Sequence, residues 1–115
     1  MNRPIALVVD DEPLIRMNLS DILESEGYEL LEAGSAPEAE MLLKARGDVS
    51  LLITDVKMPG SFDGLDLAER VASGRPQVKI VVVSGHAHSD DARLPPRAQF
   101  IRKPYTVAGI LAALG

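Results

Sequence analysis

The chain has 115 residues, of which 46% are hydrophobic, with a formal net charge of −5 and no cysteine. This length predicts one compact domain spanning residues 1–115, since single domains commonly contain about 100–150 residues, and the lack of cysteine excludes disulfide bonds and thiol catalysis. The negative charge repels a polyanion, so we expect no direct binding to nucleic acid.

No apolar stretch approaches the roughly 18 residues that a membrane-spanning helix needs, and no signal-peptide pattern is present. We therefore expect a cytoplasmic chain without a membrane partner. A single domain of this size leaves no room for a second folded unit, so an effector is expected to be another chain or sequence outside these residues.

Three short, continuous apolar runs predict buried strands at residues 5–9, 51–53 and 80–83. Continuous runs are typical of parallel strands that helices cover on both faces. Weaker strands are predicted at residues 29–33 and 99–102. Five strands separated by crossover segments predict an open α/β sheet.

Residues with helical spacing lie between these runs. Pro13 suits the first turn of a helix and Gly27 suits its end. Four apolar residues share one face of this helix: Ile15, Leu19, Ile22 and Leu23. Ser35 and Glu38 have the spacing of a capping box, and a further helix is predicted from about residue 64 to 73.

The crossover at residues 85–97 has almost no apolar periodicity, and Pro95 and Pro96 block helix continuation. We therefore predict a shortened or missing fourth helix. The last helix, at about residues 106–114, is predicted with one packed apolar face made of Val107, Ile110, Leu111 and Leu114. Three methionines are predicted to be packing residues or loop anchors: Met17, Met41 and Met58.

Polar residues follow the apolar runs: Asp10, Asp11, Asp55, Ser84 and Lys103. The carboxyl ends of parallel strands meet at one edge of the sheet, where ligands of such folds bind. Three carboxylates gathered there repel one another unless a cation is present, and Mg²⁺ prefers oxygen ligands. A carboxylate can attack phosphorus to give an aspartyl phosphate when Mg²⁺ and a lysine neutralise the transferring oxygens.

Five short motifs lie in order along the chain: residues 9–12 (VDDE), 54–60 (TDVKMPG), 63–65 (DGL), 83–85 (VSG) and 103–105 (KPY). With these motifs the chain resembles the response-regulator receiver domains of two-component signalling over essentially its whole length. The resemblance implies a flavodoxin-like, doubly wound, five-stranded parallel sheet of order 2-1-3-4-5.

The resemblance also implies the roles of the site residues. Asp55 is expected to be the phosphoacceptor in a Mg²⁺-dependent reaction. Asp10, Asp11, Asp55 and the main-chain carbonyl of Lys57 are expected to hold Mg²⁺. Ser84 is expected to hydrogen-bond the phosphoryl group.

The resemblance also implies roles for Lys103 and Phe100. Lys103 is expected to pair with the phosphoryl group, and the Lys103–Pro104 peptide is expected to be cis. Phe100 occupies the aromatic switch position of the family, although a half-buried strand aromatic is an equally good interpretation of this residue.

The expected function is that of a phosphorylation-controlled signalling module. A sensor histidine kinase or a phosphotransfer protein is expected to donate the phosphoryl group, and a downstream effector is expected to respond. Beyond its own phosphotransfer and slow dephosphorylation, no enzymatic activity is expected.

Two features depart from the usual pattern of the family. The loop after Asp55 contains an additional residue within 60–62, and the fourth crossover is abbreviated. Residues 58–68 (MPGSFDGLDLA) resemble the corresponding loop of stand-alone or kinase-fused bacterial receivers.

Other interpretations of the same residues stay open. An aspartate-nucleophile phosphatase generally needs a second acid two residues after the nucleophile, where this chain has Lys57, so that function is disfavoured. A constitutive interaction domain that is never phosphorylated is compatible with the sequence. Asp10 and Asp11 alone could cap a helix, and His86 and His88 fit a solvated loop better than a metal pair.

Overall fold

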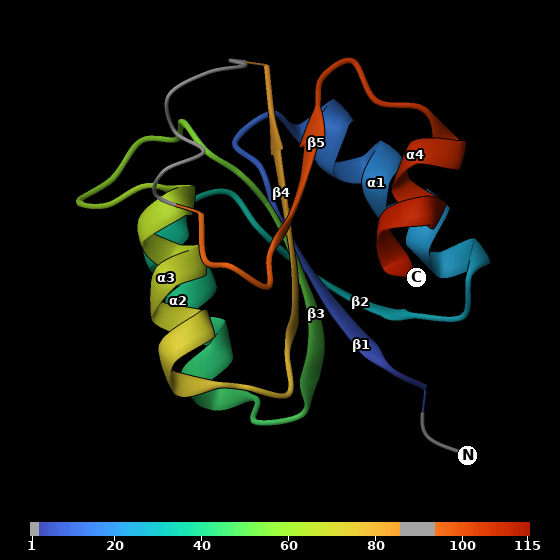
Figure 1. The fold of residues 1–115 in the computed structure, drawn as a ribbon. Helices are drawn as coiled ribbons and strands as arrows, with labels where there is room; N and C mark the ends of the chain where they lie inside the picture. The colour runs from blue at the N-terminus through green and yellow to red at the C-terminus, as the bar shows by residue number, and fades with distance from the viewer. Residues whose placement is uncertain (1–2, 86–93) are drawn as a thin grey trace.

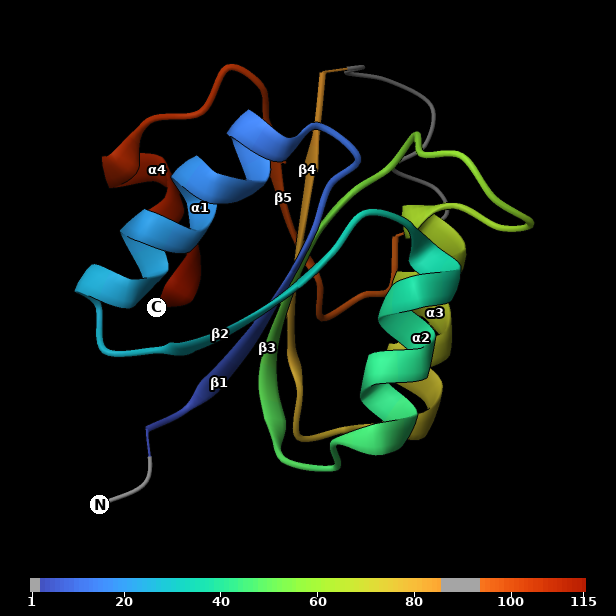
Figure 2. The same ribbon diagram turned by 180° about the vertical axis from the view of Figure 1, so that it is seen from behind.

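The computed structural model describes residues 3–85 and 94–115. In chain order the elements are β1 (Ile5–Val9), α1 (Pro13–Ser25), β2 (Glu29–Ala33), α2 (Ala36–Ala45), β3 (Val49–Asp55), α3 (Gly64–Gly74), β4 (Lys79–Ser84), β5 (Gln99–Arg102) and α4 (Val107–Leu114). The strands form one parallel sheet of order β2-β1-β3-β4-β5. Helices α1 and α4 cover one face of this sheet, and α2 and α3 cover the other (Figures 1 and 2).

The predicted sheet order and strand positions are confirmed. The two weaker strands, β2 and β5, have the predicted bounds, and β3 and β4 extend beyond their predicted apolar runs. As a result, Asp55 and Ser84 are the last residues of their strands rather than the first residues after them.

The core consists of two layers, one on each face of the sheet. Along β1, Ile5, Leu7 and Val9 belong to the layer under α2 and α3, whereas Ala6 and Val8 belong to the layer under α1 and α4. All five residues are at most 4% exposed. Burial on both faces explains why this strand is a continuous apolar run in the sequence.

Local sequence signals set the ends of the helices. Pro13 begins α1, and Gly27 beyond its end has φ of 94°, a conformation that glycine adopts without a steric penalty. Ser35 caps α2 by accepting a hydrogen bond from the amide of Glu38. Asp63 is the N-cap of α3 and forms a capping box with Asp66. The predicted start sites of these helices are therefore confirmed.

The predicted packing of α4 is wrong in part. Of its four predicted face residues, only Ile110 is buried, while Val107 is 55% and Leu111 36% exposed. Every residue of this helix is uncharged, so its apolar spacing marks no single face. Met17 and Met41 are also exposed, at 52% and 72%, which contradicts their predicted packing role; Met58 packs against the core as predicted.

Of the fourth crossover, only Gly85 and the residues from Leu94 onward are described. Residues 86–93, which include His86 and His88, lie outside the described residues, so the predictions for them are not tested. Residues 94–98 contain no helix, and a turn is closed by the amide of Ala98 donating to the carbonyl of Pro95 at 2.9 Å. Within the two described ranges, no helix is long and apolar enough to cross a membrane.

Candidate functional site

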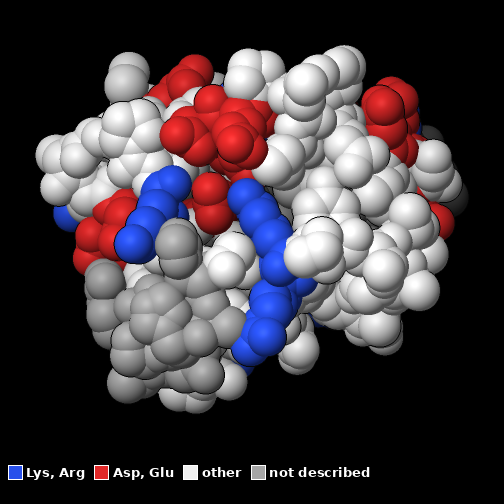
Figure 3. Space-filling model, turned by 90° about the horizontal axis from the view of Figure 1, so that it is seen from above, with Lys and Arg blue, Asp and Glu red and all other residues white. Residues whose placement is uncertain are grey.

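The polar residues singled out in the sequence lie at one edge of the sheet. Asp10 follows β1, Asp55 ends β3, Ser84 ends β4 and Lys103 follows β5. Figure 3 looks down on this edge and shows acidic side chains at its centre with basic side chains on either side. The parallel order of the strands therefore brings together residues that are far apart in the chain.

Asp10, Asp11 and Asp55 form what we call the acidic cluster. One carboxylate oxygen from each lies within 4.8 Å of the others. Asp10 is buried, Asp55 is half-buried and Asp11 is exposed, so the cluster opens to solvent on the side of Asp11. Converging carboxylate oxygens beside water suit Mg²⁺, which takes oxygen ligands and usually retains several waters.

Asp10 is held by a hydrogen bond at each of its polar groups. Its amide donates to the carbonyl of Ala33 at 3.1 Å, and its own carbonyl accepts from Nη1 of Arg16 at 2.7 Å. Its Oδ1 accepts from the amide of Glu12 at 2.9 Å, and its Oδ2 accepts from Nζ of Lys103 at 3.1 Å. The buried carboxylate is therefore fixed in both position and orientation.

Lys103 neutralises part of the negative charge of the acidic cluster. Its Nζ lies 3.1 Å from Oδ2 of Asp10 and 3.5 Å from Oδ2 of Asp55, and its side chain is 19% exposed. Burial works to lower the pKa of Lys103, but the facing carboxylates of Asp55 and Asp10 outweigh it and raise the pKa above its ordinary value. Lys103 therefore remains a cation at neutral pH.

The surroundings of Asp55 shift the pKa of its carboxyl group upward. Burial raises the pKa of its carboxyl group, and the charge of Asp10 adds to the rise. Lys103 and a hydrogen bond of 2.8 Å from the amide of Val56 to Oδ1 oppose this rise without cancelling it. An additional cation at the cluster would favour the ionised form of Asp55.

The two other predicted site residues lie beside the cluster. Ser84 is 2% exposed at the end of β4, and its carbonyl accepts a hydrogen bond of 2.8 Å from the amide of Lys103. Lys57 is exposed, two residues beyond Asp55, at the start of the loop that leads to α3. The structure thus brings the carboxylates of the three aspartates together, with the Lys103 ammonium beside those of Asp10 and Asp55. Ser84 is hydrogen-bonded to Lys103 through the main chain, and Lys57 is near Asp55 in the sequence.

Gly64 sets how closely α3 approaches the site. A Cβ atom at this position would lie 1.7 Å from the carbonyl oxygen of Asp55, and the amide of Gly64 donates to the carbonyl of Val56 at 2.8 Å. Thr54 donates its hydroxyl to the same Asp55 oxygen at 2.8 Å. Only glycine permits this approach, a role that was not predicted from the sequence.

Arg16 is a second residue whose contact with the site was not predicted. Its guanidinium bonds the carbonyl of Asp10 and also Oε1 of Glu32, at 3.0 Å. A sequence signal for such a role exists, because a cation in the first turn of a helix opposes the helix dipole. Arg16 lies in the first turn of α1, which has no acidic residue there.

Two further expectations concern the segment around Lys103. The predicted cis peptide between Lys103 and Pro104 is present. Phe100 is half-buried and packs against the core layer under α2 and α3, in register with Val82 of β4. Its packing agrees with the interpretation as a half-buried strand aromatic, and its switch role stays a prediction.

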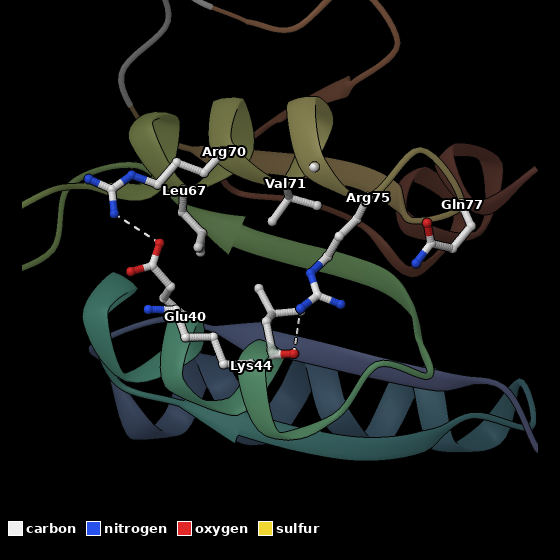
Figure 4. Close-up of a pocket in the computed structure, with 9 residues that line it drawn as sticks. Glu40, Lys44, Leu67, Arg70, Val71, Arg75 and Gln77 are labelled. Atoms are coloured by element: carbon white, nitrogen blue, oxygen red, sulfur yellow. Dashed lines mark hydrogen bonds and ion pairs between the residues drawn. The ribbon is translucent and has the colours of Figure 1, made fainter.

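A groove of about 280 Å³ lies between α2 and α3 and is separate from the acidic cluster (Figure 4). An ion pair of 2.8 Å between Arg70 and Glu40 crosses it, and Arg75 donates to the carbonyl of Leu43 at 2.6 Å. Its lining includes Val71, which is 3% exposed.

Comparison with known proteins identifies the family of the fold and of the site. The family model described as "Response regulator receiver domain" matches residues 6–114. The chain is 37% identical over 111 residues to the transcriptional regulatory protein PdtaR of Mycobacterium tuberculosis. The matched region covers 94% of this chain and 53% of that protein. It therefore spans about half the length of that relative.

Two other similarities cover most of the chain. The sensor kinase CckA of Brucella abortus is 37% identical over 105 residues, or 88% of this chain and 11% of that protein. A crystal structure of the response regulator protein TrrA from Thermotoga maritima, in complex with Mg(2+)-BeF, has a TM-score of 0.83 at 27% identity and covers 96% of both chains. With the family match and the sheet order, these findings show that the chain belongs to the response regulator receiver domains of two-component signalling.

Proposed function

We propose that Asp55 accepts a phosphoryl group from the phosphohistidine of a sensor histidine kinase or of a phosphotransfer protein. The observation that supports this most directly is the place of the Asp55 carboxylate within the acidic cluster, 3.5 Å from the ammonium of Lys103. An ionised carboxylate is already a nucleophile, so the reaction needs no separate general base.

In the proposed reaction, a carboxylate oxygen of Asp55 attacks phosphorus while the bond from phosphorus to the imidazole nitrogen of the donor breaks. The electron pair of that bond stays on the nitrogen, which takes up a proton from solvent. Lys103 pairs with a phosphoryl oxygen and the hydroxyl of Ser84 donates a hydrogen bond to another, so that charge in the transition state is stabilised.

The proposed cofactor is Mg²⁺, held by carboxylate oxygens of Asp10, Asp11 and Asp55 and by the main-chain carbonyl of Lys57. When bound, the ion supplies positive charge to the transferring oxygens. Support comes from the converging oxygens of the acidic cluster and from the complex of the similar protein TrrA with Mg(2+)-BeF.

Phosphorylation is proposed to change the affinity of the chain for a downstream effector in the cytoplasm. Ser84 and Phe100 would carry the change from Asp55 into β5, because the carbonyl of Ser84 accepts a hydrogen bond from Lys103 and Phe100, on β5, packs against the core layer under α2 and α3. We propose that residues 1–115 act as one receiver domain, with slow loss of its own phosphoryl group as its only turnover.

Incubation with acetyl phosphate and Mg²⁺, followed by intact-mass measurement, tests this function. Wild type and Asp48→Asn, which alters an exposed carboxylate remote from the site, are expected to gain one phosphoryl group, and Asp55→Asn none. Absence of an adduct on wild type would indicate a constitutive interaction domain. Continuous hydrolysis of a small phosphoester added as a separate substrate would instead indicate a phosphatase.

A further inference from the structure

Arg16 connects the first turn of α1 to the main chain of the acidic cluster. Its Nη1 donates to the carbonyl of Asp10 at 2.7 Å, and its Nε pairs with Oε1 of Glu32 on β2 at 3.0 Å. The Arg16 side chain is 22% exposed. A planar guanidinium can make both bonds at once in a fixed geometry, which a lysine ammonium on a flexible stem cannot reproduce.

The bond to Asp10 acts on a carbonyl with no access to bulk water. Asp10 is 0% exposed, so loss of the Arg16 donor leaves this oxygen buried without the partner that the structure provides. The main chain then relaxes at the peptide that joins Asp10 to Asp11. Both carboxylates depend on the orientation of that peptide.

We propose that Arg16 is a positioning residue for Mg²⁺, holding the main chain so that the carboxylates of Asp10 and Asp11 converge with that of Asp55. This inference rests on the Mg²⁺ site of the proposed function. Groups that orient metal ligands from outside the coordination sphere typically contribute 10–100-fold to metal affinity. Arg16 contacts no reacting atom and acts through Asp10.

The direction in which Mg²⁺ affinity changes when Arg16 is replaced distinguishes a positioning role from a purely electrostatic one. A guanidinium beside a metal site repels a divalent cation, so a purely electrostatic role for Arg16 would make its removal tighten Mg²⁺ binding. A positioning role requires the opposite result. Because Glu32 pairs with Arg16, the repulsion is partly compensated, so we expect the positional effect to dominate.

The test is the Mg²⁺ dissociation constant, measured by titration calorimetry with MgCl₂ alone, for wild type, Arg16→Met and Arg16→Lys. Arg70→Met is the matched control, because it also removes an arginine from an ion pair between elements, at 2.8 Å, but bonds no residue of the cluster. Melting curves without Mg²⁺ report how much each change affects the fold itself.

We expect the dissociation constant to rise about tenfold in Arg16→Met and severalfold in Arg16→Lys, with Arg70→Met within twofold of wild type. Arg16→Lys keeps the positive charge that faces Glu32, so its dissociation constant is the deciding measurement if Arg16→Met unfolds. Unchanged or tighter binding in Arg16→Lys, or a weakening of equal size in Arg70→Met, would overturn the positioning role. A wild type that binds no Mg²⁺ would overturn the proposed metal site itself.

Discussion

The Lys103 ammonium lies 3.1 Å from Oδ2 of Asp10, whose side chain is 1% exposed. Asp10 is thus a buried charge with a single cationic side chain on its carboxylate among the described residues. A buried carboxylate without a counter-charge is costly, because its ionised form is poorly solvated. This pair therefore matters for the fold as well as for the site.

Replacing Lys103 with methionine is expected to lower the free energy of unfolding by about 3 kcal/mol, since breaking a buried ion pair strands the remaining charge. The pKa of Lys103 is raised in the folded state, so its contribution is complete below the unfolded pKa and disappears only as pH rises through the folded pKa. Urea denaturation between pH 6 and 8 checks the loss. Lys44→Met, at an exposed position on α2, is the control; equal midpoints for the two variants would contradict the prediction.

Asp55→Asn is expected to raise the melting temperature in the absence of Mg²⁺ at neutral pH. Burial raises the pKa of Asp55 in the folded state, so its ionisation opposes folding. The destabilising effect of the carboxylate is present above the raised pKa and vanishes as pH falls below the pKa of the unfolded chain. Melting curves at pH 7 and at about pH 3 test this, since the gain should disappear at the lower pH.

Mg²⁺ is expected to stabilise the wild type, because a ligand that binds only the native state adds about 2.7 kcal/mol when its concentration is 100 times the dissociation constant. Asp11→Asn removes one ligand charge from the acidic cluster and should reduce the rise in melting temperature. Asp21→Asn, an exposed position on α1, should leave it unchanged. A rise that is the same in all three proteins would place the bound ion elsewhere.

Gly64→Ala is expected to lower the free energy of unfolding by about 3 kcal/mol, the upper range for forcing extra atoms into a packed site. The added Cβ would lie 1.7 Å from the carbonyl oxygen of Asp55, so the start of α3 must move. Gly74→Ala is the matched control at the other end of α3, because a Cβ there meets no atom within 4 Å. Chemical denaturation distinguishes the two, since the control should be neutral or slightly stabilised.

The strands and the acidic cluster were predictable because each depends on local sequence and on the convergence of strand ends. Residues 5–9 form a continuous apolar run, which is typical of a parallel strand buried on both faces. The meeting of Asp10, Asp55 and Lys103 follows directly, since they lie at the carboxyl ends of β1, β3 and β5, which converge at one edge of the parallel sheet.

The contacts that join distant elements were not predictable in the same way. The bond from Arg16 to Asp10 depends on β2 bringing Glu32 alongside α1, and the role of Gly64 depends on how closely α3 lies against β3. The exposure of Val107 has a similar cause, because α4 is apolar all round and only its contact with the sheet and α1 decides which side is buried.

The pairing of Asp10 with Lys103 joins residues that are 93 positions apart in the chain. Asp10 follows β1, an inner strand of the sheet that lies between β2 and β3. Bringing distant positions of a chain into contact costs conformational entropy and slows folding, because the intervening segment must lose its freedom. During synthesis, Asp10 leaves the ribosome long before Lys103, the lysine that pairs with it. A nascent chain that has not yet released β5 therefore carries an aspartate that it cannot bury without cost, and completion of the sheet waits for the strand that is made last.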